Sequence, residues 1–180
     1  VLDDDESEAE ESLSENSEAG EAAPLSLVDI SDCLSALREA EANRNLASEG
    51  LWCLQVSRKL LQEGTPNEAV HYGLRALQIA QQLNDVELQM DGHHVLGDCY
   101  CFIQVVKAEG EYTKWLRLAE KKNDHGEIWN AHLRLASILI DKARGKLVFQ
   151  TEAKRFLAAA QNHIEISLRA AEKVKKKEGP

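Results

Sequence analysis

Small side chains recur at long and nearly regular intervals in this chain, and this spacing restricts the fold more than any other feature of the sequence. Ser57, Gly97 and Ala136 are separated by two almost equal steps. The residues three positions after them are larger: Leu60, Tyr100 and Leu139. Because positions i and i+3 share one side of a helix, each pair lets a neighbouring helix approach closely and fills the remaining gap. A period of about 40 residues is typical of a repeated helix–turn–helix unit.

A second repeat and a regular series of interruptions support the same interpretation. The segment LQIAQQLND (77–85) recurs one such period later as LRLAEKKND (116–124). Residues with turn or capping chemistry separate apolar runs of helical length at 43–45, 64–67, 84–85, 107–110, 123–126 and 145. The sequence therefore predicts an all-α chain of about seven antiparallel helices joined by short loops.

Residues 1–24 differ in composition from the rest of the chain. They carry ten acidic side chains and no basic one, with almost no large apolar group. Such a segment cannot bury enough surface to offset its ordering entropy, so it is predicted to be a disordered acidic tail. Pro24 marks the boundary. The predicted organisation is a tail at 1–24, a helical repeat domain at 25–177 and a short C-terminal tail at 178–180.

Charge and composition also bear on partners and location. Outside positions 1–24, 21 acidic side chains balance 21 basic ones, so no overall basic field attracts nucleic acid, and direct nucleic-acid binding is not expected. No apolar run is long enough to cross a membrane. The four cysteines are expected to be reduced, as in a cytoplasmic or nuclear protein. Val1 in place of an initiator Met suggests a processed product or a fragment.

The repeat resembles the tetratricopeptide repeat superfamily, in a long-helix form of about 40 residues. In the best unit, five positions match the pattern of that superfamily: Ser57, Leu60, Gly64, Ala69 and Ala76. The second unit contains the similar run LGDCY (96–100), and residues 27–44 are similar to the second helix of a preceding, truncated unit. Three departures affect the packing of the second unit: Gly73 replaces a bulky residue, Trp115 replaces a small one, and the turn after Phe102 lacks its glycine.

This resemblance implies a right-handed stack of helix pairs, in which the first helix of each pair lines a concave groove. It also implies which residues face that groove. They are Leu54, Gln55, Arg58, Leu61 and Gln62 in the first unit, His94, Val95, Asp98, Cys101 and Phe102 in the second, and Asn130, Leu133, Arg134, Ser137 and Asp141 in the third. Apolar anchors among both signs of charge suit a peptide or amphipathic helix of a partner protein. Alternatively, some of these leucines pack against a terminal helix of the same chain.

The sequence contains few candidate residues for metal binding or catalysis. His93, His94, Asp98, Cys99 and Cys101 form a local cluster of metal-ligand types, but zinc needs four ligands in paired spacings and no second half-site lies nearby. Pairing of His94 with Asp98 is the alternative, and no cofactor is expected. The chain also lacks a phosphate-binding glycine loop, a nucleophile elbow and a metalloprotease signature, so we expect no enzymatic activity.

The acidic tail leaves a second function open. Ser7 and Ser12 each have a Glu three residues later, a setting that acidophilic kinases favour, and phosphorylation would add to the charge. The sequence therefore predicts a non-catalytic adaptor that binds a partner segment in its groove. One alternative is a chaperone for histones or other basic proteins, in which the tail supplies affinity. Another is a helical regulatory domain of a larger enzyme. The oligomeric state is not predicted.

Overall fold

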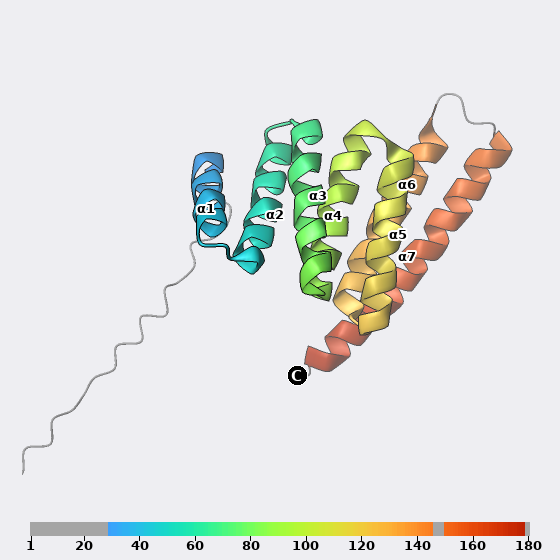
Figure 1. The fold of residues 1–180 in the computed structure, drawn as a ribbon. Coiled ribbons are helices and arrows are strands. Elements are labelled where there is room, and N and C mark those ends of the chain that lie inside the picture. The colour runs from blue at the N-terminus through green and yellow to red at the C-terminus, as the bar shows by residue number, and fades with distance from the viewer. Residues whose placement is uncertain (1–28, 146–149, 179–180) are drawn as a thin grey trace, which may run out of the picture.

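The computed structural model describes residues 29–145 and 150–178, which form seven α-helices and no strand (Figure 1). The helices are α1 (Ile30–Ala42), α2 (Leu46–Gln62), α3 (Pro66–Leu83), α4 (Val86–Ile103), α5 (Val105–Lys122), α6 (His125–Arg144) and α7 (Gln150–Glu178). Consecutive helices run in opposite directions. The prediction of an all-α chain with about seven antiparallel helices is confirmed. The acidic tail, its boundary at Pro24 and residues 179–180 lie outside the described residues.

Four of the inter-helix turns share one hydrogen-bond pattern. Each contains a residue with positive φ, namely Arg44, Gly64, Asn84 or Asn123. The amide of the following residue donates to a carbonyl five positions before it, as from Asp85 to Ala80 at 3.0 Å and from Asp124 to Ala119 at 3.0 Å. Asparagine and glycine adopt the left-handed conformation at low cost, which explains why helices end at these positions. The two Asn-Asp turns are the ones that the sequence repeat predicts.

In three of these four turns, the side chain of the residue after the left-handed position caps the next helix. The side chains of Asn45, Asp85 and Asp124 accept hydrogen bonds from backbone amides of the first turns of α2, α4 and α6, at 3.0–3.1 Å. Pro66 occupies the first turn of α3, where its missing amide hydrogen costs nothing. These short, capped turns keep neighbouring helices antiparallel and in contact.

The turn between α4 and α5 departs from this pattern. The sequence predicts an interruption at 107–110, but those residues lie inside α5, and the chain turns at Gln104 alone. Gln104 is extended, with φ −156° and ψ 93°, and its amide donates to the carbonyl of Tyr100 at 2.7 Å. Gly110 stays helical because nothing crowds it and α5 continues on both sides. The prediction was wrong here because an extended residue ends α4 without any glycine.

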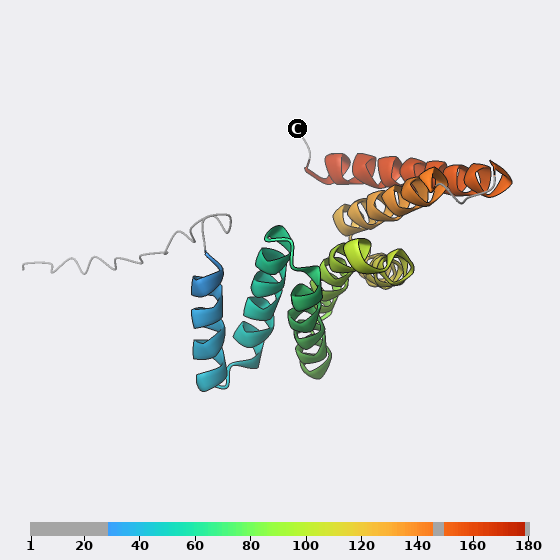
Figure 2. The same cartoon turned by 90° about the horizontal axis from the view of Figure 1, so that it is seen from above.

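The helices follow one another along a curve (Figures 1 and 2). Each packs against the next helix in the chain, and α2 also contacts α4. This direct contact places the even-numbered helices on the inner side of the curve. The order matches the prediction that α2, α4 and α6 are the first helices of three successive pairs, with α1 as the remaining half of an earlier pair.

The small residues identified in the sequence are buried between the helices. Ser57 is fully buried, and its hydroxyl donates to the carbonyl of Ala69 at 2.8 Å, across the α2–α3 pair. Gly97 lies against the ring of Tyr112, so close that an added Cβ would stand 2.3 Å from Cε1 of that ring. Ala136 packs against Ala160 in the α6–α7 pair. Small residues thus set the helix spacing in all three pairs.

Two of the three departures from the repeat pattern, at Gly73 and Trp115, also have structural roles. The backbone at Gly73 approaches Leu96 so closely that an added Cβ would lie 2.9 Å from Cδ2 of that leucine. Trp115 is fully buried, stacks on His94 with ring centroids 4.1 Å apart, and donates from Nε1 to Glu127 at 2.8 Å. A large residue at position 115 therefore joins α4, α5 and α6.

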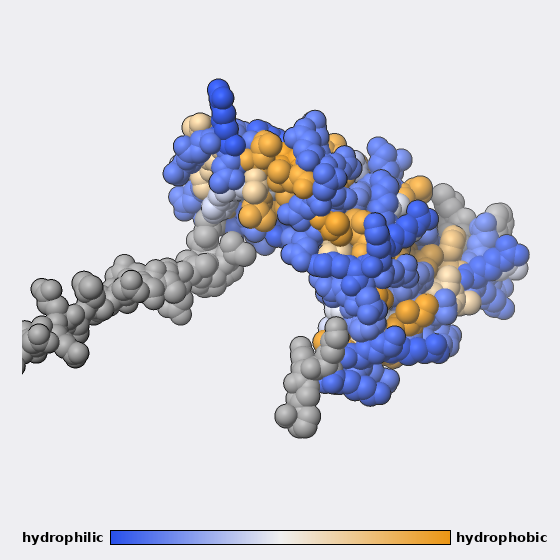
Figure 3. Space-filling model, turned by 60° about the horizontal axis from the view of Figure 1, so that its bottom comes forward, coloured by the Kyte–Doolittle hydropathy of each residue, from blue (hydrophilic) through white to orange (hydrophobic). Residues whose placement is uncertain are grey.

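The two ends of the stack differ in polarity. The outer side of α1 carries the exposed polar residues Ser31, Ser35, Arg38 and Glu39. The other end, formed by α6 and α7, has five large apolar side chains that are each 37–59% exposed: Trp129, Leu133, Leu157, Ile164 and Leu168. On the side of the molecule shown in Figure 3, hydrophobic residues appear as separate patches among hydrophilic ones. No helix within the described residues has the length and apolar character that a membrane span requires.

Candidate functional site on the inner face

Three alternate helices line one cavity on the inner face of the curve. Its volume is about 390 Å³. Eight residues predicted from the sequence line it: Leu61 and Gln62 from α2, Asp98, Cys101 and Phe102 from α4, and Arg134, Ser137 and Asp141 from α6. Phe102 is 74% exposed, an unusual position for a large aromatic side chain. The cavity therefore combines an apolar anchor point with charged groups at its edge.

Asp98 is the centre of the polar contacts in this cavity. Its carboxylate accepts a short hydrogen bond from the hydroxyl of Tyr112. It lies 3.7 Å from Nε of Arg134 and 3.5 Å from Nε2 of His94. Asp98 thus connects α4 with α5 and α6, and it leaves Asp141 as the carboxylate with the greater exposure, 71% of its side chain.

Burial determines the protonation of the groups around Asp98. Burial raises the pKa of Tyr112, and its hydrogen bond to Asp98 raises it further, so the phenol remains a neutral donor. Burial lowers the pKa of His94, against the opposing effect of Asp98. The pKa of Cys101 is also raised by burial, which is the reverse of what a nucleophilic thiolate requires. The charged groups at the edge of the cavity are therefore Arg134, Asp98 and Asp141.

Five other predicted residues lie outside the cavity lining. Gln55 is half-buried on α2, and Arg58 forms an ion pair with Asp91 of α4 at 3.3 Å. His94 stacks on Trp115 beneath the surface. Asn130 and Leu133 are exposed on α6, as are the cavity residues Arg134, Ser137 and Asp141 of that helix. The inner side of α6 is consequently open along much of its length.

Leu54 and Val95 are not on the surface, and their interpretation as groove anchors is corrected here. They are 1% and 3% exposed, and both belong to the core cluster shared by α1–α4. The physical reason is the direct contact between α2 and α4. The sides of these two helices that face each other are covered, so only residues farther toward the helix C-termini, such as Leu61 and Phe102, remain accessible.

The metal-ligand cluster considered in the sequence is spread over separate contacts. His93 Nδ1 lies 2.7 Å from a carboxylate oxygen of Glu111. Cys99 is buried, with its sulfur 3.9 Å from the hydroxyl of Ser57. In the described ranges 29–145 and 150–178, no group of three or more His, Cys, Asp and Glu side chains is placed to hold a metal ion. His94 and Asp98 do lie near each other, as the alternative interpretation of this cluster expects.

Two lining residues were missed by sequence reasoning. Tyr112 and Ile138 complete the cavity wall. Tyr112 belongs to α5, on the outer side, and its ring reaches the inner face by crossing α4 at Gly97. The pairing of a glycine on α4 with a large aromatic on α5 was visible in the sequence, but it indicates close packing and not access to a cavity. Ile138 is next to the predicted Ser137, and its burial gives no functional signal.

The phosphorylation candidates Ser7 and Ser12 lie outside the described residues. All four cysteines are free thiols, and only Cys101 is exposed. A comparison with protein-family models finds no match for this chain, and no curated protein sequence is similar to it.

Proposed function

We propose that this chain is a non-catalytic adaptor that binds a peptide or an amphipathic helix of a partner protein on the inner face of α2, α4 and α6. The single observation that carries this proposal is the cavity in which Leu61, Phe102 and Arg134 meet from three alternate helices. An exposed aromatic residue beside charged groups of both signs is typical of a surface where a partner places an apolar anchor and orients polar contacts around it.

The resemblance to tetratricopeptide repeats supports the proposal, because stacked helix pairs of that kind present their first helices on a concave binding surface. The protonation states of Cys101 and Tyr112 also support a binding function. A protonated Cys101 and a neutral Tyr112 offer hydrogen-bond donors and apolar surface, and neither is activated for chemistry. The ligand that fits is a segment with one large apolar side chain and a basic residue close to Asp141.

Substitution of Phe102 tests this function. The full chain with Phe102→Ser is expected to lose partner binding by roughly 30-fold or more, as for a central anchor worth about 2 kcal/mol. The matched control is Leu74→Ser, which removes a leucine that is 47% exposed on α3, away from the cavity. Partners captured by the unmodified chain would be identified, purified and titrated against both variants. Equal binding by Phe102→Ser and the unmodified chain would refute the inner-face site.

A second candidate function is that of a chaperone for basic proteins. It is favoured by the composition of residues 1–24, which contain ten acidic side chains and no basic one. Charge reversal of Arg134 separates the two functions. Arg134→Glu places a carboxylate beside Asp98 and should abolish binding on the inner face, while binding through the tail should survive. Arg58→Glu serves the same purpose at the neighbouring ion pair with Asp91. Retained binding that disappears with added salt would support the chaperone in place of the adaptor.

A further inference from the structure

Charge is divided between the two halves of the helical stack. Residues 25–104 contain eleven acidic and five basic side chains, whereas residues 105–180 contain ten acidic and sixteen basic ones. The first half therefore carries a net charge of −6 and the second half +6. The neutrality of the sequence beyond the acidic tail conceals this separation. An anionic ligand would be repelled by α1–α4 and attracted to α5–α7.

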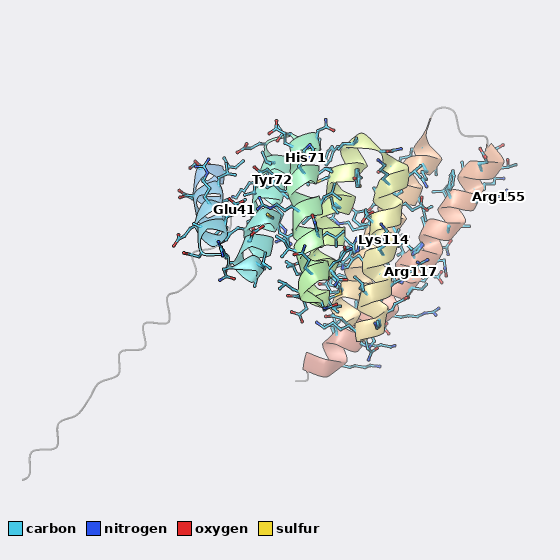
Figure 4. The ribbon with its side chains drawn as sticks, in the orientation of Figure 1. Glu41, His71, Tyr72, Lys114, Arg117 and Arg155 are labelled. Carbon is cyan, nitrogen blue, oxygen red and sulfur yellow. The ribbon has the colours of Figure 1, made fainter. Side chains whose placement is uncertain are left out.

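The basic charge of the second half is concentrated on one side of α5. Lys107, Lys114, Arg117 and Lys121 are all exposed, and their spacing of seven, three and four positions places them on one face of that helix. We call these four residues the basic stripe. Exposed Gly110 lies among them, and the half-buried Glu111 is the carboxylate beside this face. Lys114 and Arg117 are labelled on α5 in Figure 4.

The stripe retains free cationic groups. Lys114 contacts Glu111 at 2.7 Å, and the ammonium of Lys107 lies 5.4 Å from the centre of the Tyr100 ring. Arg117 and Lys121 form no hydrogen bond or ion pair with other residues of the described ranges. Exposed cations without partners bind an anion without first giving up an existing contact.

Helix α7 extends the basic surface at its lower end in Figure 4. Arg169 and Lys173 line a cavity of about 340 Å³ together with Asn123, at the C-terminal end of α5. Glu120 and His125 also line this cavity, and Glu120 is the exposed carboxylate on that side of α5. Two cations of α7 thus lie beside one depression at the C-terminal end of the stripe.

We propose that the acidic N-terminal segment of this same chain, residues 3–21, binds the basic stripe of α5 and the adjoining cations of α7. The segment carries ten carboxylates and no cation, so its charge complements the stripe along its whole length. The first half of the stack repels it, and the inner face offers Asp98 and Asp141, which oppose its approach. The stripe is the surface where its charge is best matched.

The length of the chain before α1 allows residues 3–15, which carry eight of the ten carboxylates, to reach the stripe. The part of the chain before α1 spans up to about 90 Å when extended. Neighbouring helices of a stack lie roughly 8–10 Å apart, so the path from α1 to α5 is on the order of 40 Å. The segment would pass along the outer side of the curve, where α3 and α5 lie. Binding of this kind would neutralise the basic half and leave the inner face open.

Carbodiimide cross-linking of the full chain tests the proposal, because it joins a lysine amine to a carboxylate only when the two are in contact. We expect peptides that join the acidic segment to Lys114 and Lys121 at about 10 mM salt. Their yield should fall at least about five-fold at about 1 M salt, since the screening length shortens from ~30 Å to ~3 Å. Mixing chains labelled with different nitrogen isotopes distinguishes links within one copy from links between copies.

Two variants with equal charge removal control the experiment. Arg117→Gln with Lys121→Gln should reduce the link to Lys114 several-fold, because two cations of the stripe are lost. Arg38→Gln with Arg144→Gln removes two charges elsewhere on the surface and should leave that link unchanged. All four positions are exposed, so neither variant disturbs the core.

Three cross-linking results would overturn the proposal. The first is an even distribution of links from the acidic segment over lysines throughout the chain. The second is a link to Lys114 that is equally strong in both variants. The third is a predominance of links between isotopically different copies, which would assign the segment to a second chain. Retention of the full chain on a nucleic-acid column at low salt would also contradict it, because the stripe would then be unoccupied.

Discussion

Because Gly97 has no side chain, Tyr112 of α5 can pass α4 and reach the inner face of the molecule. The ring of Tyr112 lies against the backbone of Gly97. A Cβ atom built at position 97 would stand only 2.3 Å from Cε1 of that ring. Because of this contact, a residue of the outer helix α5 donates a hydrogen bond to Asp98 at the inner cavity. A recurrent small residue thus acts both in packing and in the construction of the candidate site.

Replacement of Gly97 by alanine is therefore expected to destabilise the fold. The clash forces the tyrosine ring away and should cost about 1–3 kcal/mol, as for overpacking of a tight core. Gly110→Ala is the matched control, because nothing lies within 4 Å of its added Cβ and it is in the middle of α5. That change should stabilise the chain by roughly 0.5–1 kcal/mol. Urea unfolding measures both, and destabilisation by both substitutions would contradict the structure.

The four cysteine thiols differ in their accessibility to solvent. Cys33, Cys53 and Cys99 are buried, and burial raises the pKa of Cys53 to about 11. Alkylation of the native chain should therefore modify the exposed Cys101 first, at a rate slowed by its raised pKa, while the other three react only after unfolding. Mass spectrometry of a time course identifies the modified residue. Rapid modification of Cys53 would show that the α2–α3 core is more open than described.

Among the helical elements, the α6–α7 pair contains an unusual contact. Small residues, Ala136 and Ala160, allow the two helices to approach closely. Within this interface, the Nδ1 atoms of His132 and His163 lie 2.6 Å apart. One imidazole must donate to the other, so the contact requires at least one of the rings to be neutral. Burial lowers the pKa of both histidines, and that of His132 falls to about 4.

Acidification should weaken this pair of helices. The unfolded chain protonates histidine below a pH of about 6.5, whereas folded His132 stays neutral down to a pH of about 4. Stability is therefore complete above pH 6.5 and decreases as the pH falls toward 4, by about 1–3 kcal/mol. In the variant His132→Leu/His163→Leu, this part of the loss should disappear. Thermal melting at several pH values measures it, with exposed His71→Gln as the control. Identical pH profiles for all three chains would contradict the assignment.

At the scale of the whole molecule, each helix is held chiefly by its neighbours in the chain. Helix α1 packs on α2, through Cys33 and Leu37 in the core cluster. Stacks of this kind unfold from their ends more easily than from their middle.

The substitution Leu37→Ala, which typically costs about 2–5 kcal/mol at a buried leucine, should therefore release α1 alone. Amide hydrogen exchange is expected to rise in residues 30–42 and to remain unchanged in residues 125–144. Leu135→Ala, in the separate cluster of α4–α6, should instead raise exchange around α5 and α6. An equal rise throughout the chain after Leu37→Ala would indicate that the stack unfolds as one cooperative unit.

Much of this architecture was predictable because repeated residues perform repeated physical tasks. The Asn-Asp turns at 84–85 and 123–124 and the small residues at 57, 97 and 136 all have the roles that their spacing indicates. The five α6 positions predicted to face the groove are all exposed. Leu54 and Val95 were not predictable as core residues, because their burial depends on the direct contact of α2 with α4, which a repeat pattern does not report. The break predicted at 107–110 was wrong, because the extended conformation of Gln104 ends α4 earlier and requires no special residue.

The difference in polarity between α1 and α7 determines at which end of the stack further helices could be added by protein engineering. An additional helix pair joined after α7 would find Leu157, Ile164 and Leu168 already placed to receive its apolar side. The same pair joined before α1 would have to cover Ser35, Arg38 and Glu39, whose desolvation opposes association. Arrays built from this scaffold should consequently grow by addition at the carboxyl end and stop at the amino end.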